Sequence, residues 1–395
     1  GGYQPIRFED CKSLKAPDIE QFSDFTDGID RSISTTLALV RMMSKMLRDK
    51  EIGPYIVPII PDEARTFGMD GLFSQAGIYS PSGQNYEPVD AGTISPYKEA
   101  KDGQILQEGI CEAGSMASFM AAGTAYSHFE LPMIPIYIFY SIFGMQRIGD
   151  MVWACGDAMT KGFLIGGTAG RTTLNGEGVQ HQDGHSHVLA SIVPNMMTYD
   201  PAFAYELAVI MQDGIKRMYQ DKEDIFYYIT VYNENYTHPA MPDDSHEGIL
   251  KGMYCFRKAS DDLKKEYKGK PIHLLGSGSL MQQVIEAQEI LEKEGIPTFI
   301  WSVTSYNLLH RDFRESKESD SKSYIEEALK DHDGHFLSVS DWITLLPDSI
   351  SHLFPGGLTT LGTDGYGLSE TREALRDHFG INVESIVSKA KEISA

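Results

Sequence analysis

The residues with the clearest chemical potential lie in a glycine-rich stretch near the middle of the chain, from residue 162 to residue 187. It reads GFLIGGTAGRTTLNGEGVQHQDGHSH. Its charged and titratable side chains are Arg171, Glu177, His181, Asp183, His185 and His187. Such side chains can transfer protons or bind metal ions. Because an apolar start typical of a buried strand opens here into a loop dense in glycine, we interpret the stretch as one wall of a cofactor pocket.

Two other interpretations of this stretch stay open. It could be a solvated surface loop, since glycine-rich connections commonly run over the surface. It could also hold a transition metal through His181, His185 and His187, because the spacing of the first two would align their rings on one face of a helix. Asp183 and Gly184 lie between them and interrupt a helix, which disfavours the metal site.

Two further segments place polar residues where ligands often bind. Asp62 and Glu63 follow the apolar run 55–60, and open α/β sheets bind ligands at the carboxyl ends of their strands. The segment from Gly77 to Gly103 is rich in Pro, Gly, Ser, Asn and Asp and is long for a compact connection. We interpret it as a functional loop or lid rather than a simple connector.

Alternating strands and helices must position these residues. Strands are predicted at 55–60, 133–143, 163–165, 191–199, 225–231, 272–275, 298–303, 336–339 and 358–361. Helices are predicted at 32–50, 105–127, 147–160, 202–219, 280–294, 322–330, 342–353 and 369–379. This order predicts an α/β fold with two doubly wound, mostly parallel sheets. A polar stretch at 233–252 suggests a boundary, so we expect a linker or arm over 1–30, one domain over 31–245 and another over 246–395.

Length, charge and cysteine content narrow the classes of protein to which this chain can belong. At 395 residues, the chain is long enough for two or three domains. Its formal net charge of −22 disfavours nucleic acid and anionic lipid as partners. Four scattered cysteines without a CxxC pair indicate a reducing compartment, so we expect a cytoplasmic protein. The start lacks a signal peptide, no apolar run could cross a membrane, and a first residue other than Met suggests a piece of something longer.

Four stretches together carry a resemblance to a known family. They are Pro61–Gly68 (PDEARTFG), Gly103–Glu112 (GQILQEGICE), Pro135–Arg147 (PIYIFYSIFGMQR) and Thr172–His187 (TTLNGEGVQHQDGHSH). Their order and spacing closely resemble the homodimeric type of pyruvate dehydrogenase, the thiamine-diphosphate-dependent first component of the bacterial pyruvate dehydrogenase complex. The resemblance covers nearly the whole chain. It includes the segment LGTDGYGLSETREALRDHF, which starts at Leu361. The broader transketolase superfamily shares only the core at Gly109–Glu112.

The resemblance implies a transketolase-like pyrimidine-binding domain followed by a transketolase C-terminal-like domain. It also implies the reaction: oxidative decarboxylation of pyruvate, the product of glycolysis, with transfer of the acetyl unit to the lipoyl group of the dihydrolipoyl acetyltransferase component. The enzyme would be an oxidoreductase in a homo-oligomer, such as a homodimer. Two alternatives stay open, namely another 2-oxo acid dehydrogenase or transketolase-type enzyme, and a non-catalytic structural or assembly subunit.

The resemblance also assigns roles to particular residues. It implies that Glu112 contacts the aminopyrimidine ring of thiamine diphosphate and that His181 faces the substrate, both as catalytic residues. The other implied cofactor-binding residues are Asp62, Glu63, Tyr140 and Phe143. On sequence alone Glu108 is equally well placed, one helical turn before Glu112. Tyr140 and Phe143 could instead pack in the core of an apolar strand, and the acidic pair could begin a helix.

One departure from the family pattern concerns the metal. Thiamine-diphosphate enzymes bind Mg²⁺ and the diphosphate through a G-D-G motif that is followed by Asn, and the chain has no G-D-G. The resemblance places that motif in an amino-terminal half that is absent here. We therefore expect no metal ligands in this chain, and we expect a diphosphate-binding domain or subunit to complete the site. The stretch between Asn307 and Leu358 is also shorter than the family suggests, which leaves its partner contacts open.

Overall fold

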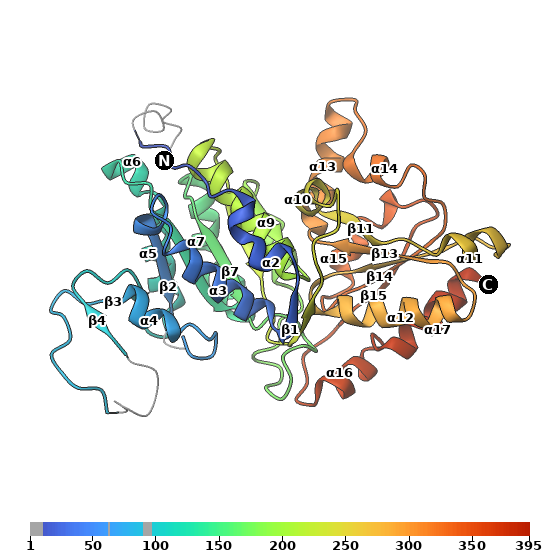
Figure 1. Ribbon diagram of the computed structural model, residues 1–395, viewed down its shortest axis with the longest axis horizontal. Helices are drawn as coiled ribbons and strands as arrows, with labels where there is room; N and C mark the ends of the chain where they lie inside the picture. Colours follow the sequence, from blue (N-terminus) through green and yellow to red (C-terminus); the bar gives the residue numbers. More distant parts are fainter. Residues whose placement is uncertain (1–10, 62–63, 90–96) are drawn as a thin grey trace.

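Two sheets, one in each half of the sequence, form the frame of the computed structural model (Figure 1). The structure describes residues 11–61, 64–89 and 97–395. Helices cover both sheets, so the chain has the two-part α/β fold that the alternation of strands and helices predicts. Within the described residues, no helix has both the length and the apolar character that a membrane span requires.

The first sheet has six strands in the order β5-β2-β6-β7-β9-β8, and every neighbouring pair is parallel. Its strands are β2 (Ile56–Ile60), β5 (Leu106–Gln107), β6 (Ile134–Tyr140), β7 (Phe163–Gly167), β8 (Met196–Tyr199) and β9 (Phe226–Thr230). All of β6 except Tyr140 is buried. A strand in the middle of a parallel sheet is covered on both faces, which explains why its sequence is almost continuously apolar.

The helices of the first unit connect these parallel strands. They are α3 (Thr35–Met46), α4 (Gly71–Ala76), α5 (Glu112–Gly123), α6 (Ala125–Phe129), α7 (Ser141–Asp157), α8 (Ser186–Ala190) and α9 (Ala204–Ile215), which continues as a π-helical turn, η3 (Lys216–Gln220). Two further sheets have two strands each. In one of them β1 (Ile29–Ile33) pairs with β10 (Tyr236–His238), and in the other β3 (Ile78–Tyr79) pairs with β4 (Glu99–Ala100). The site described below is built from α5, α7 and the loop between β7 and α8.

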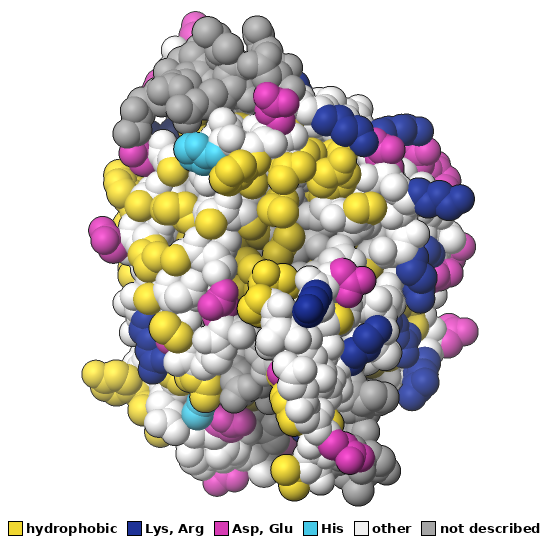
Figure 2. Space-filling view, turned by 90° about the vertical axis from the view of Figure 1, so that its left-hand side faces the viewer, with side chains coloured by type: hydrophobic (Ala, Val, Ile, Leu, Met, Phe, Trp, Pro, Cys, Tyr) yellow, Lys and Arg dark blue, Asp and Glu magenta, His cyan; other side chains and the backbone are white. Residues whose placement is uncertain are grey.

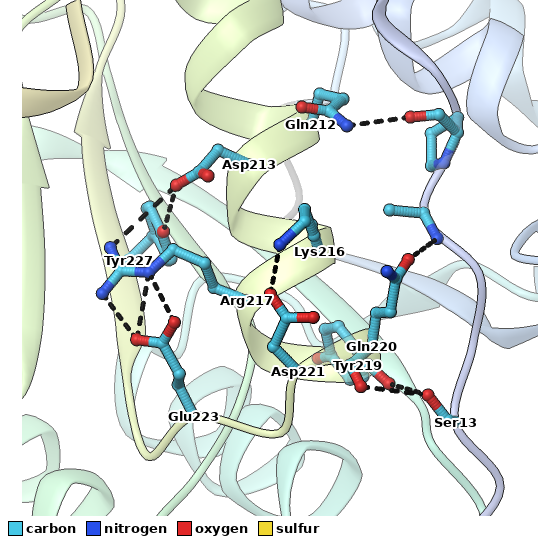
Figure 3. A network of polar contacts seen from close by, with 12 residues as sticks. Ser13, Gln212, Asp213, Lys216, Arg217, Tyr219, Gln220, Asp221, Glu223 and Tyr227 are labelled. Carbon is cyan, nitrogen blue, oxygen red and sulfur yellow. Dashed lines mark hydrogen bonds and ion pairs between the residues drawn. The ribbon is translucent and has the colours of Figure 1, made fainter. Parts of the chain in front are cut away.

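The segment before β1 is attached to the first unit. It contains a 3₁₀ turn, η1 (Ile19–Phe22), and a short helix, α2 (Ser23–Thr26). Ser13 donates to the carbonyl of Gln220 at 3.0 Å, Gln220 accepts from the backbone of Ala16 at 3.1 Å, and Gln212 donates to the carbonyl of Pro17 at 3.0 Å (Figure 3). From residue 13 onward, this part of the expected arm therefore lies along the end of α9.

The second sheet has five strands in the order β11-β13-β12-β14-β15. They are β11 (Met253–Arg257), β12 (Ile272–Gly276), β13 (Thr298–Val303), β14 (His335–Val339) and β15 (Leu358–Leu361). Only β11 runs antiparallel to its neighbour. The surrounding helices are α10 (His246–Lys251), α11 (Asp261–Glu266), α12 (Met281–Lys293), α13 (Tyr306–Glu318), α14 (Tyr324–Ala328), α15 (Leu345–Asp348), α16 (Arg372–His378) and α17 (Val383–Ser394).

Buried polar groups join the two units. Glu206 on α9 accepts hydrogen bonds from the backbone of Ala202 at 2.6 Å, the hydroxyl of Tyr254 at 2.7 Å and the hydroxyl of Ser302 at 2.6 Å. The last two partners belong to strands β11 and β13 of the second sheet. Burial raises the pKa of the Glu206 carboxyl, since the low-dielectric interior disfavours its charge. Hydrogen bonds between buried side chains therefore connect the two units.

Among the predicted element boundaries that differ from the structure, two bear on the site. The helix expected over 105–127 begins only at Glu112, because Leu106–Gln107 forms the edge strand β5. The strand expected over 133–143 ends at Tyr140, and Ser141 begins α7. A run of apolar residues does not by itself distinguish a buried strand from the first turn of a buried helix. Phe143 therefore lies on a helix rather than on a strand.

The helix α13 was not expected from the sequence. Its cap provides a local signal, since Ser305 accepts a hydrogen bond from the backbone of Leu308 at 3.1 Å. The helix expected over 342–353 is reduced to α15 and one 3₁₀ turn, η5 (Ser351–Leu353). These differences lie in the second unit, whose sheet contains the four expected strands and one that was not expected, the antiparallel β11.

We expect the stability of this chain to fall in mild acid, partly because of His273. Its ring is buried between Phe299 and Phe336, accepts from Trp301 at 3.1 Å, and has a pKa lowered to about 4 by burial. Between about pH 6.5 and about 4 the unfolded chain binds a proton that the folded chain does not. The free energy of unfolding should then fall by up to about 1.4 kcal/mol per pH unit as the pH decreases.

Urea unfolding of the wild type and of His273→Asn at pH 7.5 and pH 5 tests this. The asparagine keeps an acceptor for Trp301 and does not titrate, so the variant should lose less stability between the two pH values. Equal losses for both proteins would contradict the assignment to His273.

Candidate active site

Three aromatic rings meet where β6 ends. Tyr140 is the last residue of β6, Phe143 lies in the first turn of α7, and His181 comes from the loop between β7 and α8. The ring centres lie 5.8 Å apart for Tyr140 and Phe143, 5.4 Å for Tyr140 and His181, and 5.3 Å for Phe143 and His181. Phe67 adds a fourth ring, 5.4 Å from Tyr140. The structure thus brings together three of the residues that the sequence placed in the site.

Glu112 joins this aromatic cluster through an arginine. It is the first residue of α5, with 15% of its side chain exposed, and its carboxylate lies 2.5 Å from Nη1 of Arg147. The Arg147 guanidinium lies 4.2 Å from the centre of the Phe143 ring. Helices α5 and α7 pack against each other, so these contacts are set by the first unit alone. Phe143 therefore contacts both His181 and the arginine that pairs with Glu112.

Glu108 points to a different neighbour. It precedes α5, and its carboxylate accepts a hydrogen bond from the hydroxyl of Ser118 on that helix. The expectation that Glu108 and Glu112 occupy successive turns of one helix is wrong. The fold thus gives the two carboxylates different neighbours, which sequence spacing could not do.

Arg147 and Glu177 lie beside the expected residues although the sequence argument gave them no role. Oε2 of Glu177 lies 3.0 Å from Nδ1 of His181, without the alignment that a hydrogen bond requires. Among the described residues, Nε2 of His181 has no hydrogen-bond partner. The sequence signals that could have found the two residues are the four-residue spacings of Glu177 from His181 and of Arg147 from Phe143.

The other histidines of the motif have different surroundings. His187 is buried, its Nε2 lies 2.9 Å from the hydroxyl of Thr230, and burial lowers its pKa. Asp183 accepts from the backbone of His185 at 2.9 Å and of Ser186 at 3.0 Å, which fixes the start of α8. In the part of the chain that the structure describes, no three His, Cys, Asp or Glu side chains are arranged to hold a metal ion. The metal interpretation of His181, His185 and His187 is therefore wrong.

Two expected parts of the site lie wholly or partly outside the described residues. Asp62 and Glu63 are outside them, so their contacts are not described. The expected lid from Gly77 to Gly103 is described except for residues 90–96, and strands β3 and β4 join its two ends. Within it, the hydroxyl of Tyr86 donates to Glu99 at 2.7 Å. The described ends of this segment are thus tied to each other.

The second unit holds the start of the His181 loop. Asp341 follows β14 and accepts from the backbone of Thr172 at 2.8 Å, the backbone of Thr173 at 2.9 Å and the hydroxyl of Thr173 at 2.6 Å. Asp341 is 1% exposed, and burial raises the pKa of its carboxyl. A carboxylate with three donors at this position leaves the loop backbone little freedom.

The described residues fit one end of an aromatic heterocyclic cofactor. They offer aromatic rings, a carboxylate held by Arg147, and the His181 imidazole, whose Nε2 has no hydrogen-bond partner among these residues. A planar ring with polar nitrogens would match this donor set. They do not include a cluster of carboxylates for a divalent metal. The arrangement is therefore suited to the ring of a cofactor and leaves its anionic part to other residues.

Comparison with known proteins gives two family matches. The family described as "Pyruvate dehydrogenase E1 component middle domain" matches residues 14–239, and the family described as "Transketolase-like TK C-terminal domain" matches residues 252–382. A pyruvate dehydrogenase E1 component of Pseudomonas aeruginosa is 50% identical over 406 aligned positions, which cover 100% of this chain and 46% of that protein. One from Escherichia coli is 47% identical over 401 positions, covering 98% of this chain and 44% of that protein. The chain thus spans less than half the length of these relatives.

Solved structures show the same fold at low sequence identity. Transketolase from Leishmania mexicana superposes with a TM-score of 0.72 at 15% identity, over 98% of this chain and 48% of that one. A structure titled "Split gene transketolase, inactive beta4 tetramer" gives a TM-score of 0.62 at 16% identity, over 92% of this chain and 99% of that one. The arrangement of two α/β units is therefore transketolase-like.

We expect Asp341→Ala to destabilise the chain by about 2–5 kcal/mol, because it leaves buried backbone and hydroxyl donors without an acceptor. Asp364→Ala is a matched control, since Asp364 is exposed and accepts from the backbone and hydroxyl of Thr344. The control should change stability by less than about 1 kcal/mol. Urea unfolding measures both, and equal effects would show that the Asp341 contacts do not hold the loop.

Proposed function

Since the chain belongs to the family of pyruvate dehydrogenase E1 component middle domains, we propose that it supplies the pyrimidine-binding half of a thiamine-diphosphate site in a pyruvate dehydrogenase. The proposed reaction is the oxidative decarboxylation of pyruvate, with the acetyl unit passing to a lipoyl group of the dihydrolipoyl acetyltransferase component. The pyrimidine-binding domain would span 31–245 and a transketolase-like C-terminal domain 246–395. The observation that carries the proposal is that Phe143 contacts both His181 and Arg147, the arginine that pairs with Glu112.

In this proposal Glu112 activates the cofactor. When bound, thiamine diphosphate supplies an electron sink for decarboxylation. The Glu112 carboxylate would hydrogen-bond to a ring nitrogen and share a proton with it, which requires a carboxylate of fixed position. Arg147 holds one of its oxygens, and only 15% of the side chain is exposed. The ion pair therefore orients the carboxylate at a partly desolvated position.

The aromatic cluster of Tyr140, Phe143 and His181 would act on the cofactor ring and the substrate. Tyr140 and Phe143 would orient a flat ring and exclude water from it. His181 has Nδ1 directed at Glu177, so Nε2 is the atom that would hold or move a proton next to the substrate. Asp62 and Glu63 complete the proposed cofactor-binding residues.

The proposal includes a second polypeptide region that binds the diphosphate and Mg²⁺. The chain has no G-D-G motif. Exposed hydrophobic side chains of the first unit include Ile110, Phe129 and Trp153, which are 68%, 72% and 50% exposed. Hydrophobic side chains also gather on the face seen in Figure 2, at the end of the first unit. Exposed apolar surface of this kind supports a partner, and we propose a homo-oligomer.

The cysteines support the proposed location. All four of them, Cys11, Cys111, Cys155 and Cys255, are free thiols. Free thiols persist in a reducing compartment, so we propose that the protein acts in the cytoplasm.

Glu112→Gln should abolish most turnover of pyruvate in the complete enzyme, with the diphosphate-binding half present. Loss of proton sharing at one carboxylate should lower kcat by about 10²–10⁴-fold. Glu108→Gln is the matched control, because Glu108 lies four residues away in sequence and bonds to Ser118 instead. Near-normal turnover of Glu112→Gln, or an equal loss for both variants, would contradict the role of Glu112. Activity with branched 2-oxo acids or sugar phosphates in place of pyruvate would favour the alternative enzymes.

Calorimetry with thiamine diphosphate and Mg²⁺ tests the half-site. Titrated into this chain alone, the cofactor should bind weakly and without dependence on Mg²⁺. Addition of a diphosphate-binding half should give tight, metal-dependent binding. Tight metal-dependent binding by this chain alone would contradict the half-site, and no binding with the partner present would favour a structural subunit.

A further inference from the structure

Gln182 links the residue beside His181 to the second unit. Its side chain is 1% exposed. Its Nε2 donates to the carbonyl of Leu174 at 2.7 Å, and its Oε1 accepts from the backbone of Leu368 at 2.7 Å. Leu174 belongs to the same loop as His181, whereas Leu368 lies in the second unit, in the segment between β15 and α16. One carboxamide thus uses both ends to join two segments that are far apart in the sequence.

The two segments lie against each other over several residues. The backbone of Gly176 donates to the carbonyl of Glu370 at 3.0 Å, and Arg372 donates to the carbonyl of Thr173 at 2.8 Å. A Cβ atom added to Gly367 would collide with Oε1 of Gln182. The segment of the second unit therefore approaches the glutamine as closely as a glycine allows.

Backbone bonds transmit this link to His181. The amides of His181 and Gln182 both donate to the carbonyl of Gly178, at 3.1 and 3.2 Å, so the two residues belong to one tight turn. A shift of the glutamine would move this turn and with it the imidazole that packs against Tyr140 and Phe143. Small displacements of a reacting group reduce catalysis far more than they reduce substrate binding.

We propose that Gln182 is a positioning residue, through which the second unit sets the place of the His181 imidazole. This inference rests on the proposed function, in which His181 faces the substrate. Asp341 holds the start of the loop at Thr172 and Thr173. Gln182 holds its end, next to the histidine. The C-terminal unit thereby contributes to catalysis through the position of His181.

Kinetics of Gln182→Leu in the complete enzyme test the proposal. The expected result is a fall in kcat of about 10- to 100-fold with KM for pyruvate changed by less than about threefold, because positioning rather than binding is lost. Gln182→Glu should restore most of kcat, since a protonated carboxyl can accept from Leu368 and donate to Leu174. An unchanged kcat for Gln182→Leu, or a failure of Gln182→Glu to restore it, would overturn the proposal.

Gln288→Leu controls for the loss of a buried glutamine as such. Gln288 is also 1% exposed, donates to the carbonyl of Thr298 at 2.6 Å and accepts from Arg257 at 3.2 Å, all within the second unit. It should leave kcat within about twofold of the wild type. An equal fall in kcat for Gln288→Leu and Gln182→Leu would show a general structural effect and would overturn the proposal.

Hydrogen exchange on this chain gives a readout that does not depend on turnover. In Gln182→Leu, the amides of 174–182 and of Leu368 should exchange at least about tenfold faster than in the wild type, and in Gln288→Leu they should not. Unchanged exchange at these amides would overturn the link. If the wild-type complete enzyme does not turn over pyruvate while the exchange result holds, the proposed function fails and the link between the units stands.

Discussion

The loop that carries His181 has little apolar surface, so its position depends on hydrogen bonds from the second unit. Asp341 holds the backbone of Thr172 and Thr173, and Gln182 bridges the loop to Leu368. These contacts are buried, where an unpaired donor would be strongly unfavourable. The glycines of the loop permit its tight turns but add conformational freedom, which the contacts with the second unit remove.

The first unit provides the other wall of the site by ordinary packing. Parallel strands end at one edge of the sheet, and α5 and α7 begin there. Glu112 lies at the first position of its helix, where the positive end of the helix dipole favours a carboxylate. Arg147 then pairs with it and covers Phe143. The packing of α5 against α7 thus places the Glu112–Arg147 ion pair next to the Phe143 ring.

Local sequence patterns accounted for most of the architecture. The apolar runs predicted eight of the strands of the two sheets close to their observed positions, because strands buried on both faces need continuous apolar sequence. The family resemblance, which rests on motifs such as TTLNGEGVQHQDGHSH, assigned Glu112, Tyr140, Phe143 and His181 to one site. Element ends were less accurate, as the starts of α5 and α7 show, because apolar runs continue from strand into helix.

By itself, then, the sequence determined the α/β class, the buried strands and the residue types of the site. Only the tertiary structure decided that Glu112 pairs with Arg147 whereas Glu108 pairs with Ser118, and that Gln182 and Asp341 bind across the two units. Periodicity reports which face of an element is buried and carries no information on which distant segment covers it. The partners of Gln182 and Asp341 in the other unit lie far away in sequence, so folding alone brings them together.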